Sequence, residues 1–242
     1  MRSRIKNFIS DTVLLLRSVP SSIVSLFVLS VVLMNLLANK TIYQRGFLAV
    51  DGGIVVSWLT FLCMDIITKR FGARAATQVS VFALAVNLLA VGIFAIVSAI
   101  PTETDYSAFN GIFGGSWFIV LSSSLAFLAS AIVNNGLNAA IGRLFEANPD
   151  GRAAYCTRSY VSTFIGQFVD NFVFASLVFM VFAPIYWGGF SWTLPQCVSC
   201  SLIGAGMELF MEVIFSPIGY GVCRRWQREN VGSAYLNAHA VA

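Results

Sequence analysis

The sequence predicts an all-α membrane protein, a six-transmembrane-helix bundle with both termini in the cytoplasm. Three observations lead to this prediction. Hydrophobic residues make up 57% of the chain and charged residues only 11%, against roughly half and a quarter in soluble domains. Apolar runs of about 20 residues, long enough to cross ~30 Å of hydrocarbon, recur along the chain. Basic residues gather in alternate loops between these runs, as the positive-inside rule requires.

The apolar runs follow one another with only short polar loops between them. No loop is long enough to fold alone, so residues 1–242 are expected to form a single membrane domain. Residues 1–20 mix charged and apolar residues at helical spacing, which predicts a cytoplasmic leader that is either solvated or lies along the inner membrane surface. Residues 223–242 predict a cytoplasmic tail. The expected spans are about 22–39, 48–68, 77–99, 116–140, 160–185 and 198–221.

The distribution of Lys and Arg predicts the orientation. Thirteen of the 15 lie in the leader, the second and fourth loops and the tail, whereas Lys40 and Arg45 lie in the first loop. This bias places both termini on the cytoplasmic side of a cell membrane, inner or plasma, and requires an even number of spans. The lipid bilayer is therefore an expected partner. Nucleic acid is not, because the basic residues form no continuous face.

Acidic residues lie within three of the expected spans. They are Asp65 in the second span, Asp170 in the fifth, and Glu208 and Glu212 in the sixth. A charged side chain inside a span costs about 2.5–3.5 kcal/mol, which favours a functional role. No Lys or Arg lies at mid-span to neutralise Asp170, Glu208 or Glu212, so their expected partner is a proton or a ligand with N–H donors or positive charge. Asp51, near the outer end of its span, is either solvated or functional.

Polar residues share one face of the fifth span. Gln167, Asp170 and Asn171 recur at helical spacing. Asn134 in the fourth span and the two glutamates of the sixth add polar groups at similar depth, which predicts a polar cavity between the second, fourth, fifth and sixth spans. Asn and Gln also join membrane helices without binding a ligand, and that alternative stays open for Asn134.

The cysteines predict neither a metal site nor a disulfide framework. Cys197 and Cys200 form a CxxC pair, but zinc needs four ligands and the single histidine, His239, lies in the distant tail. We therefore expect no metal and no cofactor.

Four sequence motifs resemble those of the vitamin-uptake or queuosine-precursor transporter family, and the likeness spans most of the chain. Its most specific elements are Asn35 with Lys40, the motif around Asp65, and Gln167 with Asp170. The motifs are M-N-L-L-A-N-K at 34–40, W-L-T-F-L-C-M-D-I-I-T at 58–68, F-G-A-R-A-A at 71–76 and S-T-F-I-G-Q-F-V-D-N-F-V-F at 162–174.

The resemblance implies an inner-membrane importer of 7-cyano- or 7-aminomethyl-7-deazaguanine, from which the tRNA nucleoside queuosine is made. A carboxylate such as Asp170 or Glu208 would accept a paired hydrogen bond from a guanine-like edge, with Trp58 and Phe174 available for stacking. Lys69 replaces a typical Glu of the family. Asn134 replaces a frequent Asp, and Met207-Glu208 stands where the family has a basic residue. These departures favour a divergent member whose substrate is a related vitamin-like or purine-like compound.

The residues and the resemblance together assign expected roles. Gln167, Asp170 and Asn171 are expected to recognise the substrate. Asn134, Phe174 and Trp58 are expected to assist them. Glu208 and Glu212 would supply ligand charge or proton coupling. Asn35, Lys40 and Asp65 would serve gating or structure.

Two readings from other classes remain. The chain is alternatively the substrate-binding membrane subunit of an ATP-driven vitamin transporter, whose ATPase module would be a separate partner because no G-x-x-x-x-G-K-[ST] loop occurs here. A homodimer is another possible assembly. An intramembrane enzyme is the weakest reading, since H-E-x-x-H and G-x-S-x-G are absent, and we expect no enzymatic activity.

Overall fold

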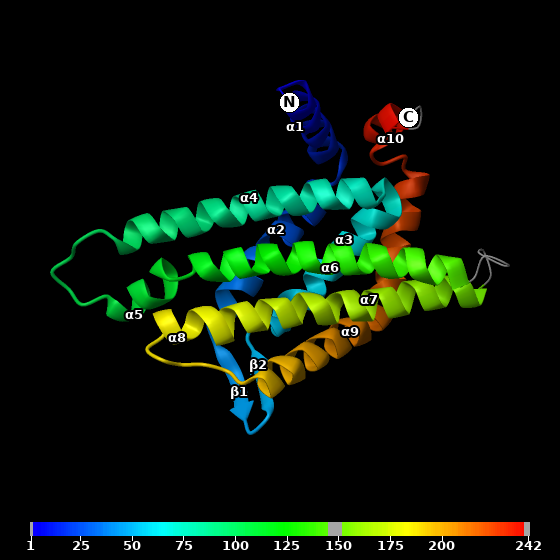
Figure 1. Ribbon diagram of the computed structural model, residues 1–242. Helices are drawn as coiled ribbons and strands as arrows, with labels where there is room; N and C mark the ends of the chain where they lie inside the picture. Colours follow the sequence, from blue (N-terminus) through cyan, green and yellow to red (C-terminus); the bar gives the residue numbers. More distant parts are fainter. Residues whose placement is uncertain (1, 145–151, 240–242) are drawn as a thin grey trace. The chain divides into compact units, whose positions relative to one another are not determined.

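The computed structural model describes residues 2–144 and 152–239 and consists mainly of long helices (Figure 1). Four described segments are long and apolar enough to cross a membrane, and a fifth is added if the bent pair Phe8–Ser18 and Ser21–Leu37 counts as one span. These segments make the chain a multi-pass α-helical membrane protein, as predicted. The count of six spans stays a prediction. The four are Ala73–Ser98, Ser107–Ser130, Phe164–Tyr186 and Leu194–Phe215.

The described elements follow one another in a largely helical order that is interrupted by one β hairpin. They are α1 (Arg2–Ser18), α2 (Ser21–Leu37), β1 (Thr41–Arg45), β2 (Leu48–Asp51), α3 (Ile54–Phe71), α4 (Ala73–Ser98), α5 (Ser107–Phe109), the π-helical turn η1 (Asn110–Gly114), α6 (Trp117–Leu144), α7 (Arg152–Ala175), the π-helical η2 (Ser176–Phe182), α8 (Ala183–Tyr186), α9 (Leu194–Arg228) and α10 (Ser233–His239).

The second expected span, 48–68, begins too early. Its first residues form β2, which pairs antiparallel with β1, and the helix begins only at Ile54. The physical reason lies in the Asp51-Gly52-Gly53 sequence. Asp51 Oδ1 accepts a hydrogen bond from the Gly53 N–H at 2.6 Å, and such a side-chain-to-backbone bond closes a turn in place of continuing a helix.

The segments predicted as a leader and a tail both contain helix. The leader forms α1, which turns by 112° from α2. The sixth expected span extends in both directions to form α9, and a further short helix, α10, follows it. Hydropathy detects only the apolar part of a helix, so it does not show the polar ends of α9 or the helices α1 and α10.

The chain divides into two compact units, which we describe separately. The first unit comprises Met1–Leu33, Val56–Leu89 and Met211–Ala242. Its core is built from α1, α2, α3, α4, the second half of α9 and α10, and its largest fully buried side chains include Leu15, Ile67 and Tyr235. α3 and α4 are separated by one residue, Gly72, and Phe71 at the end of α3 packs on both Trp226 and Tyr235.

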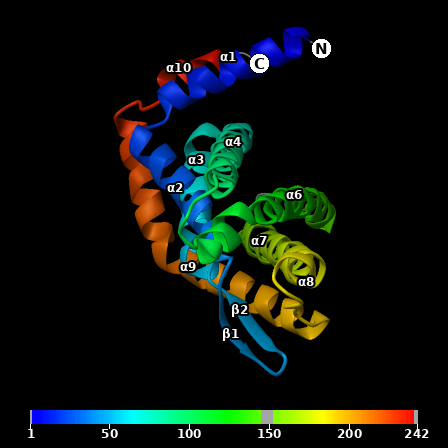
Figure 2. The same cartoon turned by 90° about the vertical axis from the view of Figure 1, so that its left-hand side faces the viewer.

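The second unit comprises Met34–Val55 and Ala90–Phe210. Within it α6 and α7 run side by side, as both views show (Figures 1 and 2). Its core is strongly aromatic: Phe179 stacks on Trp192 with ring centroids 3.8 Å apart, and Phe118 stacks on Tyr186 at 5.3 Å. Stacked pairs of this kind add about 0.5–1.5 kcal/mol each beyond the area that they bury.

The β hairpin of the second unit is fastened to the first two turns of α9. Gln196 Nε2 donates to the Gly46 carbonyl at 2.9 Å, and Ser199 Oγ lies 2.7 Å from the Phe47 carbonyl. The Ala49 N–H donates in turn to Ser199 Oγ at 3.2 Å. Because Gln196 and Ser199 are three residues apart, they lie on one face of α9, and this face carries the hairpin.

Candidate functional site

The polar face of α7 forms the centre of the candidate site, within the second unit. Gln167 is 5% exposed, and Asp170 and Asn171 are partly buried. The helical repeat places all three toward the same side of α7. The neighbouring helices α6 and α9 each contribute a polar partner to this face, Ser130 and Glu208 respectively. The polar cavity between the second, fourth, fifth and sixth spans stays a prediction.

Asp170 is joined to α6 through Ser130. The Ser130 hydroxyl lies 3.2 Å from Asp170 Oδ1 and 3.1 Å from the Phe127 carbonyl of its own helix. Sequence analysis missed Ser130. The available signal was its spacing, because Ser130 and Asn134 are four residues apart and therefore share a face of α6.

Asn171 joins α7 to α9. Its Nδ2 donates to the Gln167 carbonyl at 3.0 Å and lies 3.4 Å from Glu208 Oε2. Glu208 is only 2% exposed, so this contact forms away from the surface of the chain. A buried carboxylate requires such donors, because burying an ion without them is costly.

Gly204 makes the close approach of Asn171 to α9 possible. A Cβ atom added at this glycine would lie 3.0–3.2 Å from the amide atoms of the Asn171 side chain. Sequence analysis missed this residue as well. The only local signal was that Gly204 lies one helical turn before Glu208. Small residues at such positions allow helix backbones to approach each other in membranes.

Gln167 offers an acceptor to this site. Its Oε1 is buried and has no hydrogen-bond partner among the described side chains and backbone. An unsatisfied buried acceptor costs about 1–3 kcal/mol, which a donor from a bound molecule would recover. Together with Asp170 and Glu208, the site therefore presents acceptor oxygens from both helices and an amide that donates and accepts.

Of the four other predicted substrate contacts, two lie elsewhere and two fall outside the described side chains. Phe174 is partly buried and packs against the aromatic core of the second unit. Trp58 belongs to the first unit, where it stacks on Phe215 with centroids 4.7 Å apart. The side chains of Asn134 and Glu212 lie outside the described residues.

The residues expected to serve gating or structure are split between the units. Asp65, in the first unit, pairs with Lys69 one turn later at 3.6 Å, and both are substantially exposed. In the second unit Asn35 is 4% exposed, whereas Lys40 is exposed and accepts the Gly52 N–H on its carbonyl at 2.7 Å. This backbone bond closes the base of the hairpin.

Asp51 is buried, at 7% exposure, so the solvated alternative for this residue is wrong. Its second carboxylate oxygen accepts from the Cys200 thiol at 3.5 Å. Cys197 and Cys200 are both buried free thiols. In the described part of the chain, no group of three or more His, Cys, Asp and Glu side chains is placed to hold a metal ion.

Comparison with known proteins confirms the family suggested by the sequence motifs. The model of the family described as "Putative vitamin uptake transporter" matches residues 51–222, most of the chain. Neither the curated proteins nor the solved structures give a match. The matched range contains α3 to the greater part of α9 and therefore the whole candidate site. The chain belongs to the vitamin uptake transporter family.

Proposed function

We propose that the chain is an inner-membrane importer of a queuosine precursor, 7-cyano- or 7-aminomethyl-7-deazaguanine, or of a related vitamin-like compound. One observation carries this proposal: Asp170 meets Ser130 of α6, and the Asn171 amide meets Glu208 of α9, at one polar face of α7 within otherwise apolar spans. Polar groups at such depth are expensive in a lipid environment, so a bound polar substrate is the economical explanation for them.

The geometry of the acceptors favours a flat, donor-rich heterocycle. A guanine-like edge carries a ring N–H and an exocyclic amine side by side, and one carboxylate accepts both with strong directional preference. Asp170 or Glu208 would make this paired bond. Gln167 and Asn171 would orient the remaining polar atoms, because each amide both donates and accepts. Phe174, which belongs to the same unit as these residues, is the proposed stacking group.

Transport would proceed by alternating access across six spans with both termini in the cytoplasm. In this topology α2 and α3 complete the count, and α3 carries Asp65 near its cytoplasmic end. Glu208 and Glu212 would couple substrate movement to protons, and Asn35, Lys40 and Asp65 would serve gating. Reporter fusions at each terminus test the topology: a periplasmic signal from either fusion would contradict it.

Uptake of labelled deazaguanine by cells that express the chain tests the function. Wild type should accumulate the label above an empty-vector control, and Asp170→Ala should abolish that accumulation at equal protein abundance. Asp105→Ala is the matched control, because Asp105 lies in an exposed loop, where its carboxylate accepts from the nearby Ser107 N–H at 2.9 Å. Equal uptake by wild type and Asp170→Ala would remove Asp170 from the site. No uptake by wild type would reject this substrate.

A panel of deazapurines and vitamins then defines the ligand, since a true ligand raises the melting temperature by mass action. Reconstitution in liposomes distinguishes a self-sufficient importer from the substrate-binding subunit of an ATP-driven transporter. The purified chain in liposomes should transport unaided, whereas the substrate-binding subunit of an ATP-driven transporter would bind its ligand but transport only with an ATPase module.

A further inference from the structure

In the first unit, the C-terminal helix α10 folds back onto α1 and α4. Gly232, with φ +76°, provides the turn, and its lack of a side chain leaves room for the Phe71 ring. Arg70 fixes the same turn by donating to the Val231 carbonyl through Nη2 at 2.8 Å and Nε at 3.2 Å. This backbone path places His239, the single histidine of the chain, beside α1.

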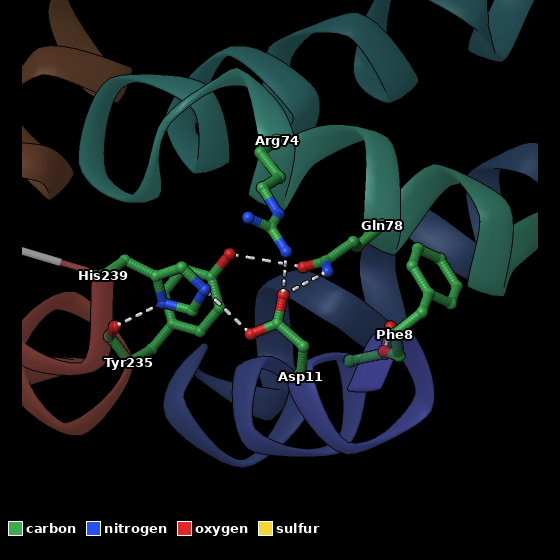
Figure 3. A network of polar contacts seen from close by, with 7 residues as sticks. Phe8, Asp11, Arg74, Gln78, Tyr235 and His239 are labelled. Atoms are coloured by element: carbon green, nitrogen blue, oxygen red, sulfur yellow. Dashed lines mark hydrogen bonds and ion pairs between the residues drawn. The ribbon is translucent and has the colours of Figure 1, made fainter. Parts of the chain in front are cut away.

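Asp11 of α1 is the centre of a polar network that joins the three helices (Figure 3). Its Oδ2 accepts from Arg74 at 3.0 Å and from Gln78 at 2.7 Å, both on α4. Its Oδ1 lies 2.8 Å from His239 Nε2 on α10. The Asp11 side chain is only 12% exposed, so solvent replaces these contacts poorly.

The two nitrogen atoms of His239 both face acceptors. Nδ1 lies 2.9 Å from the Tyr235 carbonyl, and Nε2 faces the Asp11 carboxylate. A carbonyl and a carboxylate only accept hydrogen bonds, so each nitrogen must carry a hydrogen for both contacts to form. A neutral imidazole has a single N–H and would turn one lone pair toward an oxygen. Both contacts are therefore satisfied only by the protonated ring.

Several other charged or titratable groups lie around the His239 ring. The charged and titratable groups that face it are Asp11 from α1, Arg74 from α4 and Tyr235 from α10, with the Gln78 amide beside them. Burial raises the pKa of Tyr235, so its hydroxyl stays protonated and donates to Gln78 Oε1 at 3.2 Å. Of these residue types, only histidine ordinarily changes charge between pH 5 and pH 8.

We propose that α10 is a pH-sensitive latch, which closes on Asp11 when His239 is protonated and loosens when His239 loses its proton. Closure joins α10 to the same carboxylate that binds α1 to α4, and so restrains the movement of α1. The charge distribution predicts a cytoplasmic position for these segments, so the latch would respond to cytoplasmic pH. Both α1 and α10 lie outside the matched residues 51–222, and the proposal does not depend on the transported substrate.

Hydrogen exchange of the purified full-length chain, without a histidine tag, tests the latch at pH 6 and pH 8. Exchange rates are expressed as protection factors, which removes the intrinsic pH dependence of amide exchange. We expect α10 and the part of α1 around Asp11 to be about threefold to tenfold more protected at pH 6, from the loss of one charge-assisted contact at pH 8. Equal protection in wild type at both pH values would overturn the proposal.

Two variants identify the titrating group. His239→Gln cannot titrate and should show the same α10 protection at both pH values. Glu229→Gln is the matched control: it removes a surface pair with Arg225, at 2.8 Å, just before the Gly232 turn, and should keep the wild-type difference. A pH difference that persists in His239→Gln, or that disappears in Glu229→Gln, would assign the effect to another group and overturn the latch.

Discussion

The side-chain amide of Asn171 on α7 lies 3.4 Å from the carboxylate of Glu208 on α9, and Gly204 leaves the space for this approach. The contact requires a donor on one helix, an acceptor on the next and a missing side chain between them. The donor, the acceptor and the glycine can each be substituted separately. The proposed substrate site can therefore be tested without removing any of its carboxylates.

Gly204→Ala should reduce substrate uptake. The added methyl group would lie 3.0–3.2 Å from the Asn171 amide, which must give by a few tenths of an ångström and so weakens its contact with Glu208. Weakening one hydrogen bond to a charged group should lower uptake by about threefold to tenfold. The measurement is initial uptake rate, normalised to the amount of chain in the membrane.

Gly206→Ala is the control for that substitution. It makes the same change two residues further along α9, where an added Cβ meets nothing within 4 Å. Alanine is the better helix former by about 0.8–1.0 kcal/mol, so this variant should transport normally with unchanged or slightly raised stability. Equal losses in both variants would show that helix backbone effects, and not the Asn171 contact, limit uptake.

Ser130→Ala should weaken substrate binding without abolishing it. The variant removes the hydroxyl that lies 3.2 Å from Asp170 Oδ1, so the carboxylate loses one donor but keeps its position on α7. A hydrogen bond to a charged group contributes about 1.5–3 kcal/mol, which corresponds to about a tenfold to hundredfold higher Kd. Ser124→Ala, whose hydroxyl bonds only to the Val120 carbonyl of its own helix at 2.7 Å, should bind like wild type.

The sequence predicted one helix face of this site and the carboxylate of Glu208, but it missed Ser130 and Gly204. Gln167, Asp170 and Asn171 were found because a 3.6-residue repeat places them together within a single segment. Ser130 and Gly204 are unremarkable within their own helices. Their importance depends on which helices are neighbours and at what depth, which periodicity alone does not contain.

The hairpin and the latch were missed for different reasons. A hydropathy window treats Leu48 to Asp51 as part of an apolar run, because a strand and a helix of equal hydrophobicity look alike in short segments. His239 stood isolated in the sequence. Its partner Asp11 lies at the opposite end of the chain, and only the turn at Gly232 brings the two together.

Glu208→Gln should remove any pH dependence of uptake. If Glu208 carries the coupled proton, wild-type uptake should rise as the external pH falls, because protonation precedes inward movement. Glutamine keeps the size of the side chain and a hydrogen-bonding oxygen but cannot release a proton, so uptake should become slow and independent of pH. The measurement is initial uptake between pH 5.5 and pH 8. Retained pH dependence in this variant and in Glu212→Gln would reject proton coupling through these residues.

Ser199→Ala should destabilise the hairpin on α9. Ser199 Oγ accepts the Ala49 N–H at 3.2 Å, and Ala49 is fully buried, so the variant leaves that donor without its acceptor. An unsatisfied buried group costs about 1–3 kcal/mol, which should appear as a lower free energy of unfolding for the purified chain. Ser201→Ala is the matched control, because its hydroxyl is also buried and donates to the Cys197 carbonyl within α9, at 2.7 Å. A larger loss from Ser201→Ala than from Ser199→Ala would contradict the role of this serine in holding the hairpin.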